Sequence, residues 1–505
     1  MVQIKDFSKF EGKEVEIQGW ISNKRSSKGI EFIVFRDGSG FTQCVVNIDD
    51  AGEKSYETAK NAGQEASLKI KGTVVKDDKQ IGGYEVQATA VKLIGTSEDF
   101  PLTNKEHGVE FLMDNRHLWL RSQSQWAIMQ IRNTIIFSIH EFFQQEGFIQ
   151  ADAPLLTANA AEGTTSLFST EFYGEEAYLS QSGQLYGEAM AMALGKIYTF
   201  GPTFRAEKSK TRRHLSEFWM IEPEMAFYNN EMNMDLIEKF LRFVVKAVLD
   251  KNNSELKILE RDTAILEAVT ENEFPRLTYH DAVKILKGEK EVNGKTTLQT
   301  LKEDLAELQA KIKKNKDGIA ERETIIKGGV KKGKRNFLQR KIDELKNENK
   351  ALEIKAGNIP GWIESAKNFK TGSDFGGSDE TVLTRMFNVP VMVYNWPHKI
   401  KAFYMKRDKS APDLAKGVDV LAPEGYGEIV GGGERETDRA LLIEKINEHG
   451  LPMDAFSWYL DLRKFGAVPH AGFGLGLERM VAWMCNLQHI RETIPFPRMY
   501  GRVSP

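Results

Sequence analysis

The length, composition and charge of the chain exclude several classes of protein. At 505 residues it exceeds the roughly 250–300 residues at which one hydrophobic core stops growing, so at least two domains are expected. A net charge of −3 excludes a protein held to nucleic acid by bulk positive charge, but it leaves room for a local basic surface. The two cysteines, Cys44 and Cys485, are far apart, which argues against a disulfide framework or a thiolate metal site.

The chain is expected to be cytoplasmic and to have no membrane partner. Its first twenty residues alternate charged and apolar side chains and lack the apolar core of a signal peptide. No run approaches the ~18 apolar residues that a membrane helix needs.

Residues 1–98 are expected to form a small closed β-barrel of the oligonucleotide-binding (OB) kind. Five strand patterns separated by turn signals lie at 13–22, 30–37, 41–48, 67–76 and 84–94. A helix-capable stretch at 50–63 stands between the third and fourth patterns, as an OB-fold requires. Any other small β-barrel is the alternative.

After a connector at 99–115, residues 116–505 are expected to form an antiparallel sheet flanked by helices, giving an α+β fold. The helix patterns lie at 124–147, 232–249 and 475–486. Between them, residues 162–227 have the pattern of strands and turns, and further strand patterns lie at 390–397, 401–406, 416–423 and 427–435. Pro154, within residues 148–157, indicates an edge, a bend or an interface. Because strands and helices do not alternate regularly, a parallel α/β sheet is not favoured.

Residues 288–368 are expected to form a helical hairpin inserted into this second domain. Two charged runs with Leu and Ile at helical spacing flank a basic, glycine-rich tip, KGGVKKGKR. The tip has five basic residues and no acidic one, so it can either contact a phosphate backbone or be a solvated turn, and the second is favoured.

Three separated stretches resemble the motifs of one enzyme family. They are the helix with Pro154, the segment from FRAE to EF at 204–218, and HAGFGLGLERM at 470–480. In this order they are similar to motifs 1, 2 and 3 of the class II aminoacyl-tRNA synthetases. The barrel and the QSGQ run at 181–184 narrow the resemblance to the aspartyl, asparaginyl and lysyl subgroup. It implies an anticodon-binding OB-fold domain, a class II catalytic domain and a homodimer.

The resemblance implies that ATP is bound by residues of motif 2. Attack of an amino-acid carboxylate on the α-phosphorus needs positioning and cations more than a general base. Arg205 can clamp the α-phosphate and the carboxylate, because a guanidinium fork matches both. Glu207 is expected to accept from the adenine amino group, Phe218 to stack on adenine, and His214 to reach the β- and γ-phosphates.

Motif 3 is expected to complete the nucleotide site. Arg479 resembles the arginine that covers the other face of adenine and binds the γ-phosphate, and Gly474 and Gly476 leave room for the nucleotide. For each of these residues the alternative is a structural ion pair or a packed side chain.

Magnesium is expected beside the phosphates, because this ion takes few carboxylates and completes its shell with phosphate and water. Glu428 resembles the metal-ligating glutamate of the family and Asp419 its companion. Both can instead be partners of nearby arginines. Gly431 stands where aspartyl enzymes usually have a serine, which puts one contact of that pattern in doubt.

The amino-acid substrate is predicted to be asparagine. An aspartate side chain needs two cations, whereas a carboxamide needs one donor and one acceptor. Arg435 resembles the arginine that receives the side-chain oxygen in both kinds of enzyme, so it does not discriminate. Gly187 stands where aspartyl enzymes have a lysine, and Glu222 replaces their usual aspartate, so Glu222 is expected to accept from the amide NH2. Further contacts are expected from four residues: Glu162, which resembles a mobile-loop glutamate that meets the substrate ammonium, and Ser182, Gln184 and Glu224.

In the barrel, Phe32 and Gln43, with Arg25 in a loop before the strand of Phe32, match the positions of the family's anticodon reader. An exposed aromatic can stack on an unpaired base, and a Gln or Arg can read its edge. Phe32 can also be an ordinary core aromatic. The predicted reaction is thus ATP-dependent attachment of asparagine to tRNA-Asn through an adenylate.

Three alternative functions stay open from the sequence. The nearest is an aspartyl enzyme, either one specific for tRNA-Asp or one that does not discriminate between tRNAs. A paralogue that synthesises asparagine would normally lack the barrel. A regulator with an inactive site would be expected to have lost at least one of the motif residues, which are all present.

Overall fold

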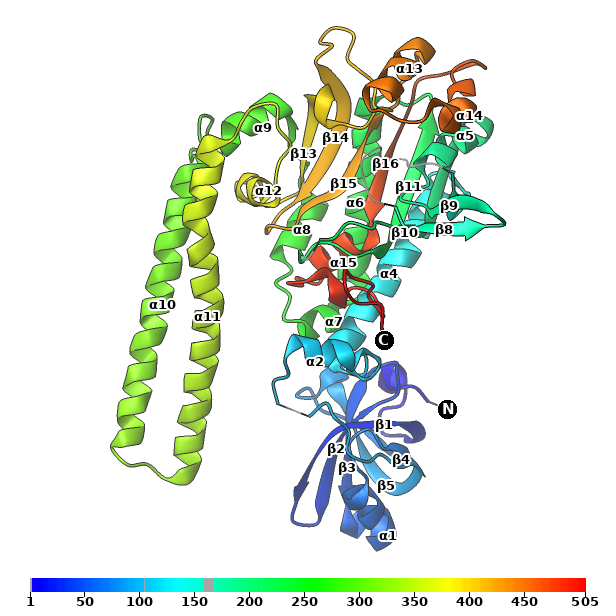
Figure 1. The fold of residues 1–505 in the computed structure, drawn as a ribbon. Coiled ribbons are helices and arrows are strands. Elements are labelled where there is room, and N and C mark those ends of the chain that lie inside the picture. The colour runs from blue at the N-terminus through cyan, green and yellow to red at the C-terminus, as the bar shows by residue number, and fades with distance from the viewer. Residues whose placement is uncertain (1, 104, 159–166, 210) are drawn as a thin grey trace. The chain divides into compact units, whose positions relative to one another are not determined.

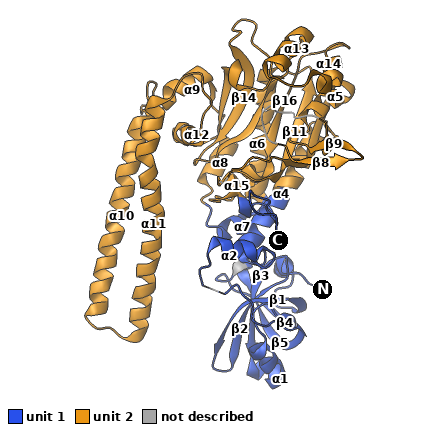
Figure 2. Ribbon diagram, in the orientation of Figure 1, with its two compact units in different colours: residues 1–134, 251–261, 491–505 blue, residues 135–250, 262–490 orange. Residues whose placement is uncertain are grey.

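The computed structural model describes residues 2–103, 105–158, 167–209 and 211–505. Within it, the chain divides into two compact units (Figure 2). The first unit comprises residues 1–134, 251–261 and 491–505, and the second comprises 135–250 and 262–490. No helix among the described residues combines the length and the apolar character that crossing a membrane requires.

The N-terminal strands close into a five-stranded barrel, as predicted (Figure 1). Their order around the barrel is β1 (Glu14–Ser27), β2 (Ile30–Arg36), β3 (Phe41–Asn47), β5 (Tyr84–Gly95) and β4 (Ser67–Lys76). Helix α1 (Ile48–Asn61) joins β3 to β4. Alternate residues of β2, such as Ile33 and Phe35, point into a buried core with Cys44 and Ile70, as a strand period of two dictates. The first unit also contains three short helices: α2 (Val109–Asp114), α3 (Arg116–Trp119) and α7 (Asn253–Ile258).

The second unit is built on an eight-stranded sheet. The strand order is β12 (Arg276–Thr278), β13 (Val391–Pro397), β14 (Leu414–Ala422), β15 (Gly427–Glu434), β16 (His470–Gly476), β11 (Glu217–Ala226), β10 (Lys196–Phe204) and β6 (Ile149–Gln150). The pairs at the two ends, β12 with β13 and β6 with β10, are parallel, and the pairs between them are antiparallel. A smaller sheet has the order β7 (Leu156–Thr157), β9 (Glu175–Leu179) and β8 (Ser169–Phe172).

Helices α4 (Gln123–Gln145) and α6 (Asn230–Lys251) pack on one face of the large sheet. Phe143 of α4 stacks on Tyr198 of β10, with ring centroids 4.8 Å apart, and Phe240 of α6 lies 5.9 Å from Phe473 of β16. Side chains alternate between the two faces of a sheet along a strand. Phe473 faces α6, so Gly474 and the other even-numbered residues of β16 lie on the opposite face of the sheet. That opposite face carries the candidate site.

The second unit contains further helices. They are α5 (Gln184–Leu194), α8 (Ala264–Glu271), α9 (Tyr279–Leu286), α12 (Gly377–Thr384), α13 (Arg439–Glu448), α14 (Ser457–Asp461) and α15 (Leu477–Met484). Of these, α5, α9, α12 and α15 pack against strands of this sheet.

The predicted hairpin consists of α10 (Thr297–Lys327) and α11 (Lys332–Asn368), which lie side by side (Figure 1). Helix α10 begins at a capping box, in which Thr296 and Gln299 satisfy each other's backbone N–H groups. The base of the hairpin is buried: Leu301 and Ile359 pack into a core that contains Tyr279 and Trp396.

Two local predictions were wrong. Residues 184–194 form helix α5, because Leu, Ala and Met favour a helix that the expectation of strands and turns over 162–227 overlooked. Residues 401–406 form turns, with only an isolated bridge between Met405 and Arg435, because Phe403 and Tyr404 are buried against helices instead of in the sheet. The predicted antiparallel sheet is present, and it has in addition one parallel pair at each end.

Candidate active site

The floor of the site is a run of glycines at the centre of the large sheet. Gly431 of β15 pairs with Gly474 of β16. A Cβ atom on Gly474 would lie 2.7 Å from Cε of Met220, and one on Gly431 would lie 2.8 Å from Oε1 of Glu428. Side chains there would collide with neighbours or fill the pocket, so these glycines keep a flat surface open for a ligand. Gly476 also lines this pocket.

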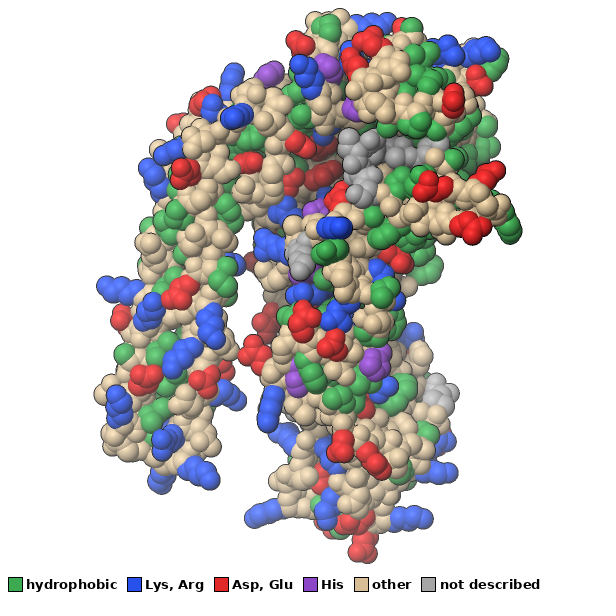
Figure 3. Space-filling view, in the orientation of Figure 1, with side chains coloured by type: hydrophobic (Ala, Val, Ile, Leu, Met, Phe, Trp, Pro, Cys, Tyr) green, Lys and Arg blue, Asp and Glu red, His purple; other side chains and the backbone are tan. Residues whose placement is uncertain are grey.

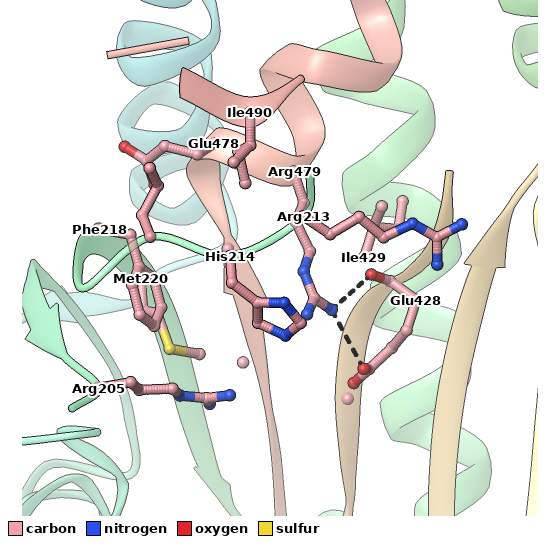
Figure 4. A pocket seen from close by; sticks show the side chains of 14 residues that line it. Arg205, Arg213, His214, Phe218, Met220, Glu428, Ile429, Glu478, Arg479 and Ile490 are labelled. Atoms are coloured by element: carbon pink, nitrogen blue, oxygen red, sulfur yellow. Dashed lines mark hydrogen bonds and ion pairs between the residues drawn. The ribbon is translucent and has the colours of Figure 1, made fainter. Parts of the chain in front are cut away.

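One wall of the pocket comes from the hairpin of β10 and β11. The guanidinium of Arg205 lies 5.4 Å from the ring centroid of Phe218, and both side chains line the pocket (Figure 4). His214, in the loop between these strands, also lines it and is bonded to Thr211 and to Ser209, at 3.2 Å. Burial lowers the pKa of His214, and the nearby Arg479 lowers it further, so the ring is neutral at pH 7.

The opposite wall carries Arg479 and Glu428. Nη1 of Arg479 donates to the backbone oxygen of Glu428 at 2.8 Å and to Oε2 of its carboxylate at 3.2 Å (Figure 4). Loss of hydration raises the pKa of Glu428, but the positive charges of Arg479, Lys401 and Arg205 outweigh it and hold the pKa below its usual range. In the same GLER segment, Glu478 is buried and accepts from the backbone N–H of Trp219 at 2.9 Å, which ties α15 to β11.

Carboxylates gather next to Arg479. Asp419 of β14 lies near Gly431, as Glu428 does, and accepts from Nζ of Lys401 at 2.5 Å. Burial raises the pKa of Asp419 to about 7 against the attraction of Lys401, and the charge of Glu428 raises it further. Asp419 and Glu428 therefore bring two carboxylates together over Gly431, and carboxylate oxygens are the ligands that a hard divalent cation takes. No group of three or more His, Cys, Asp and Glu side chains that could hold a metal occurs in the part of the chain that the structure describes.

A different set of polar residues lies farther along β11. Glu222 is 4% exposed, and its carboxylate accepts from the Ser182 hydroxyl, from the Gly183 N–H at 2.7 Å and from Thr199 at 3.3 Å. These donors fix the carboxylate at the N-terminal end of α5. Ser182 also accepts from the backbone N–H of Gln184, at 3.1 Å.

Arg435 is held by Glu224, two residues beyond Glu222 on the same strand face. Nε and Nη2 of Arg435 donate to the two oxygens of Glu224 at 3.2 and 2.5 Å, and both side chains are buried. The Glu224 charge raises the pKa of Arg435, despite burial, so this guanidinium stays charged. A Cβ atom on Gly187 would lie 3.1 Å from Cγ of Glu224, which places Gly187 directly against this pair.

Behind the pair lies a buried network around Glu188 that sequence reasoning missed. Glu188 accepts from Arg463 at 2.6 Å, from Tyr459 at 2.7 Å and from Gln184 at 3.0 Å, and its other contact is the His470 ring at 2.9 Å. Burial raises the pKa of Glu188, but the charge of Arg463 and the bond to His470 outweigh it and hold the pKa far below its usual range. The network fixes α5 and, through Gln184, one side of the site.

Two predicted residues lie outside this arrangement. Glu207 is half-buried and close enough to His214 for its charge to act on that ring, but it does not line the pocket with Arg205 and Phe218. Glu162 falls outside the described residues.

Arg213 and Glu380 were not predicted as site residues. Nη1 of Arg213 donates to Glu380 at 2.8 Å, and Arg213 lines the pocket. Burial and the charge of Glu428 raise the pKa of Glu380 to about 7, against the attraction of Arg213. The basic loop KSKTRRH was the available signal for Arg213. The acidic run at 374–380 gave no residue-level signal, because it reaches the site only through α12.

On the barrel, the three predicted anticodon residues share one outer face. Arg25 pairs with Phe32, and Val34 pairs with Gln43, so register places Arg25, Phe32 and Gln43 on the face opposite the buried Ile33. The guanidinium of Arg25 lies 4.5 Å from the Phe32 ring centroid, and Gln43 donates to Glu85 at 2.9 Å. Arg25 lies on strand β1, which corrects its expected place in a loop.

Models of known families match both parts of the chain. A model described as class II tRNA synthetases (D, K and N) matches residues 108–500, and a model described as an OB-fold nucleic acid binding domain matches residues 15–94. The chain belongs to this class II synthetase family. The family model spans the candidate site, and the OB-fold model spans the face that carries Phe32.

Relatives of this synthetase are similar over their full length. An asparagine–tRNA ligase of Symbiobacterium thermophilum is 46% identical over 505 residues, 100% of this chain and 99% of that protein, and one of Lactobacillus johnsonii is 44% identical with the same coverage. The crystal structure of asparaginyl-tRNA synthetase from Pyrococcus horikoshii complexed with asparaginyl-adenylate matches with a TM-score of 0.79 and 34% identity, covering 98% of this chain and 97% of the other.

Proposed function

We propose that this synthetase attaches asparagine to tRNA-Asn through an asparaginyl-adenylate, with ATP as the second substrate. The observation that carries the proposal is the pair of buried groups at the amino-acid end, Arg435 and Glu222. A guanidinium and a carboxylate offer one donor and one acceptor, which is what a carboxamide requires. Full-length similarity to proteins named asparagine–tRNA ligase supports the same substrate.

ATP fits the glycine-floored pocket with its adenine between Phe218 and Arg479. An aromatic ring on one side and a guanidinium on the other stack on a base. Arg205 then bridges the α-phosphate and the attacking carboxylate, so it stabilises charge that develops in the transition state. Neutral His214 can donate a hydrogen bond to the β- or γ-phosphate, and Glu207 stays the proposed acceptor for the adenine amino group.

Magnesium fits the carboxylates beside the phosphate end. Asp419 and Glu428 would hold it, with phosphate and water completing the shell. Bound there, the ion would neutralise charge on the phosphates of ATP. Lys401 keeps Asp419 in position by its 2.5 Å contact.

At the amino-acid end, we assign the side-chain oxygen of asparagine to Arg435 and its NH2 group to Glu222. Glu224 orients Arg435, and Ser182 and Gln184 shape the pocket at the start of α5. Gly187 lacks the cation that would neutralise an aspartate carboxylate, and Glu222 would repel that carboxylate. Glu162 stays the proposed partner of the substrate ammonium.

The function is tested by charging purified tRNA-Asn in the presence of ATP and Mg²⁺. Labelled asparagine is expected to become ester-linked to the tRNA, and labelled aspartate is not. Charging with aspartate at a comparable rate would favour the alternative, an aspartyl enzyme that does not discriminate.

Phe32→Ala is expected to raise KM for tRNA in the charging reaction by about tenfold, since stacking of a base on an aromatic contributes about 1–3 kcal/mol. Asparagine-dependent ATP–pyrophosphate exchange is expected to stay within about twofold of wild type, because the barrel takes no part in adenylate formation. Phe35→Ala, a change in the barrel core, serves as the contrast. If Phe32→Ala lowered the melting temperature as much as Phe35→Ala, a structural role would replace the proposed one.

We also propose a homodimer, formed through the region of Pro154. Four apolar side chains of that region, Phe137, Ile149, Leu155 and Leu156, are 40–65% exposed. Such a group on a soluble surface indicates an interface. Because charged tRNA is used by ribosomes, we propose a cytoplasmic location for the reaction.

A further inference from the structure

The hairpin of α10 and α11 carries its positive charge at its free end. Residues 297–368 contain 17 Lys and Arg and 11 Asp and Glu, a net charge of +6 in a chain whose total is −3, which leaves −9 on everything else. Within the hairpin, residues 311–346 hold 13 basic and 5 acidic residues, net +8, while the part nearer the base is net −2. Blue side chains accordingly gather toward the tip in Figure 3.

Three lysines of the helical shaft, Lys311, Lys316 and Lys346, form ion pairs across the hairpin, whereas no cation of the tip does so among the described residues. Lys311 pairs with Glu348 at 2.8 Å and Lys316 pairs with Glu353 at 3.0 Å. Among the described residues, no ion pair involves the five tip cations, all of them exposed: Lys327, Lys331, Lys332, Lys334 and Arg335. Phe337, two residues beyond this cluster, is 53% exposed. Exposed cations beside an exposed aromatic are the chemistry of a nucleic-acid contact.

The hairpin is built as an arm that is fixed at one end. Its base is held by Leu301 and Ile359 in the core of the second unit and by a 2.6 Å ion pair between Asp304 and Arg385. Leu338 and Ile342 of α11 are buried toward the tip, where α11 packs against α10. At 1.5 Å per residue, the 31 residues of α10 span about 46 Å. No residue of the described range 297–368 lines the glycine-floored pocket, so the arm is not needed to form that pocket.

We propose that the tip cluster, residues 327–335, binds the sugar–phosphate backbone of the tRNA that the enzyme charges. This inference rests on the proposed function for the identity of the RNA. The hairpin, with a net charge of +6, attracts a polyanion, whereas the rest of the chain has a net charge of −9. Lysine and arginine side chains on a glycine-containing turn contact phosphates without reading sequence, so the arm adds affinity and leaves specificity to the anticodon face.

The test compares two quadruple variants that remove the same charge from the two ends of the hairpin. The tip variant is K331A/K332A/K334A/R335A. The matched control is K302A/K350A/K355A/K367A, four exposed lysines in the part of the hairpin nearer the base that form no ion pair with any described residue. Filter binding of tRNA-Asn is measured over a series of KCl concentrations. The tip variant is expected to raise Kd by about tenfold or more and to reduce the slope of log K against log salt by about 2–3, because each phosphate contact contributes about 0.7–0.9 to that slope.

The control variant is expected to keep the wild-type slope, and a tip variant with three Lys→Arg changes, K331R/K332R/K334R, is expected to keep wild-type affinity. Asparagine-dependent pyrophosphate exchange should be unchanged in all of them, which separates this inference from the proposed function. Equal Kd values for the tip variant and the control would overturn the inference. It would also be overturned if the tip variant bound tRNA normally but lost sedimentation with vesicles of phosphatidylserine and phosphatidylcholine, since the arm would then be a membrane contact.

Discussion

Arg205→Ala is expected to lower asparagine-dependent ATP–pyrophosphate exchange by about 10²–10³-fold. Removal of one donor that acts on developing charge in a desolvated site has an effect of this size. The guanidinium stacks on Phe218 and lines the nucleotide pocket. Its loss therefore removes a group that positions the nucleotide as well as the positive charge that neutralises the phosphate. Arg205→Lys is expected to recover only part of the rate, because an ammonium keeps the charge and loses the planar fork.

The control for Arg205→Ala is the stability of the fold. Arg205 is half-exposed, and an exposed cation–π contact contributes about 0.5–1 kcal/mol, so thermal unfolding should shift by only a few degrees. Binding of tRNA-Asn in the absence of ATP should stay near the wild-type value. Exchange within threefold of wild type would show that Arg205 is a structural residue and not the clamp.

Glu222→Gln is expected to lower the rate of asparagine-dependent ATP–pyrophosphate exchange by about 10–100-fold. The ratio of the exchange rates with asparagine and with aspartate is expected to fall by at least the same factor. A hydrogen bond to a charged group contributes about 1.5–3 kcal/mol, which converts to such factors. Glutamine has the same shape, and its side-chain oxygen can still accept from the Gly183 N–H that now lies 2.7 Å from Glu222. Its neutral side chain no longer repels an aspartate carboxylate.

The matched control for Glu222→Gln is Glu217→Gln on the same strand. Residues 217 and 222 have opposite parity on β11, so the Glu217 side chain leaves the strand on the face away from the amino-acid pocket. The control is expected to be indistinguishable from wild type with both amino acids. If Glu222→Gln kept the full discrimination against aspartate, selectivity would have to come from another group.

The barrel and the hairpin could be predicted from the sequence because their patterns are local. Alternation of apolar residues identified the five strands, and Leu and Ile at helical spacing identified α10 and α11. Helix α5 was missed because its Gly187 and its position inside a segment predicted as strands and turns masked the helical tendency of its Ala and Met residues. Residues 401–406 looked like a strand because Phe403 and Tyr404 are apolar, but their partners are helices.

In the site, the motif residues could be predicted from the sequence, but the side chains that form ion pairs with them could not. The structure brings five of the motif residues together, because one pocket is lined by Arg205, His214, Phe218, Glu428 and Arg479. The partners of Asp419 and Arg213 are Lys401 and Glu380, which lie 18 and 167 residues away from them. Only the folded sheet and α12 bring such residues together, so these pairs cannot be predicted from the local spacing of residues in the sequence.

The most direct test of the account is ATP–pyrophosphate exchange by the purified enzyme, measured with asparagine and with aspartate at equal concentrations and without tRNA. Buried Glu222 accepts from three donors beside the pocket, and Arg435 is charged, so the site matches a carboxamide and repels a carboxylate. Discrimination by such buried polar groups reaches about 10⁴–10⁵ when the wrong ligand leaves a group unpaired. The account predicts strong exchange with asparagine and none above background with aspartate; equal or greater exchange with aspartate would contradict it.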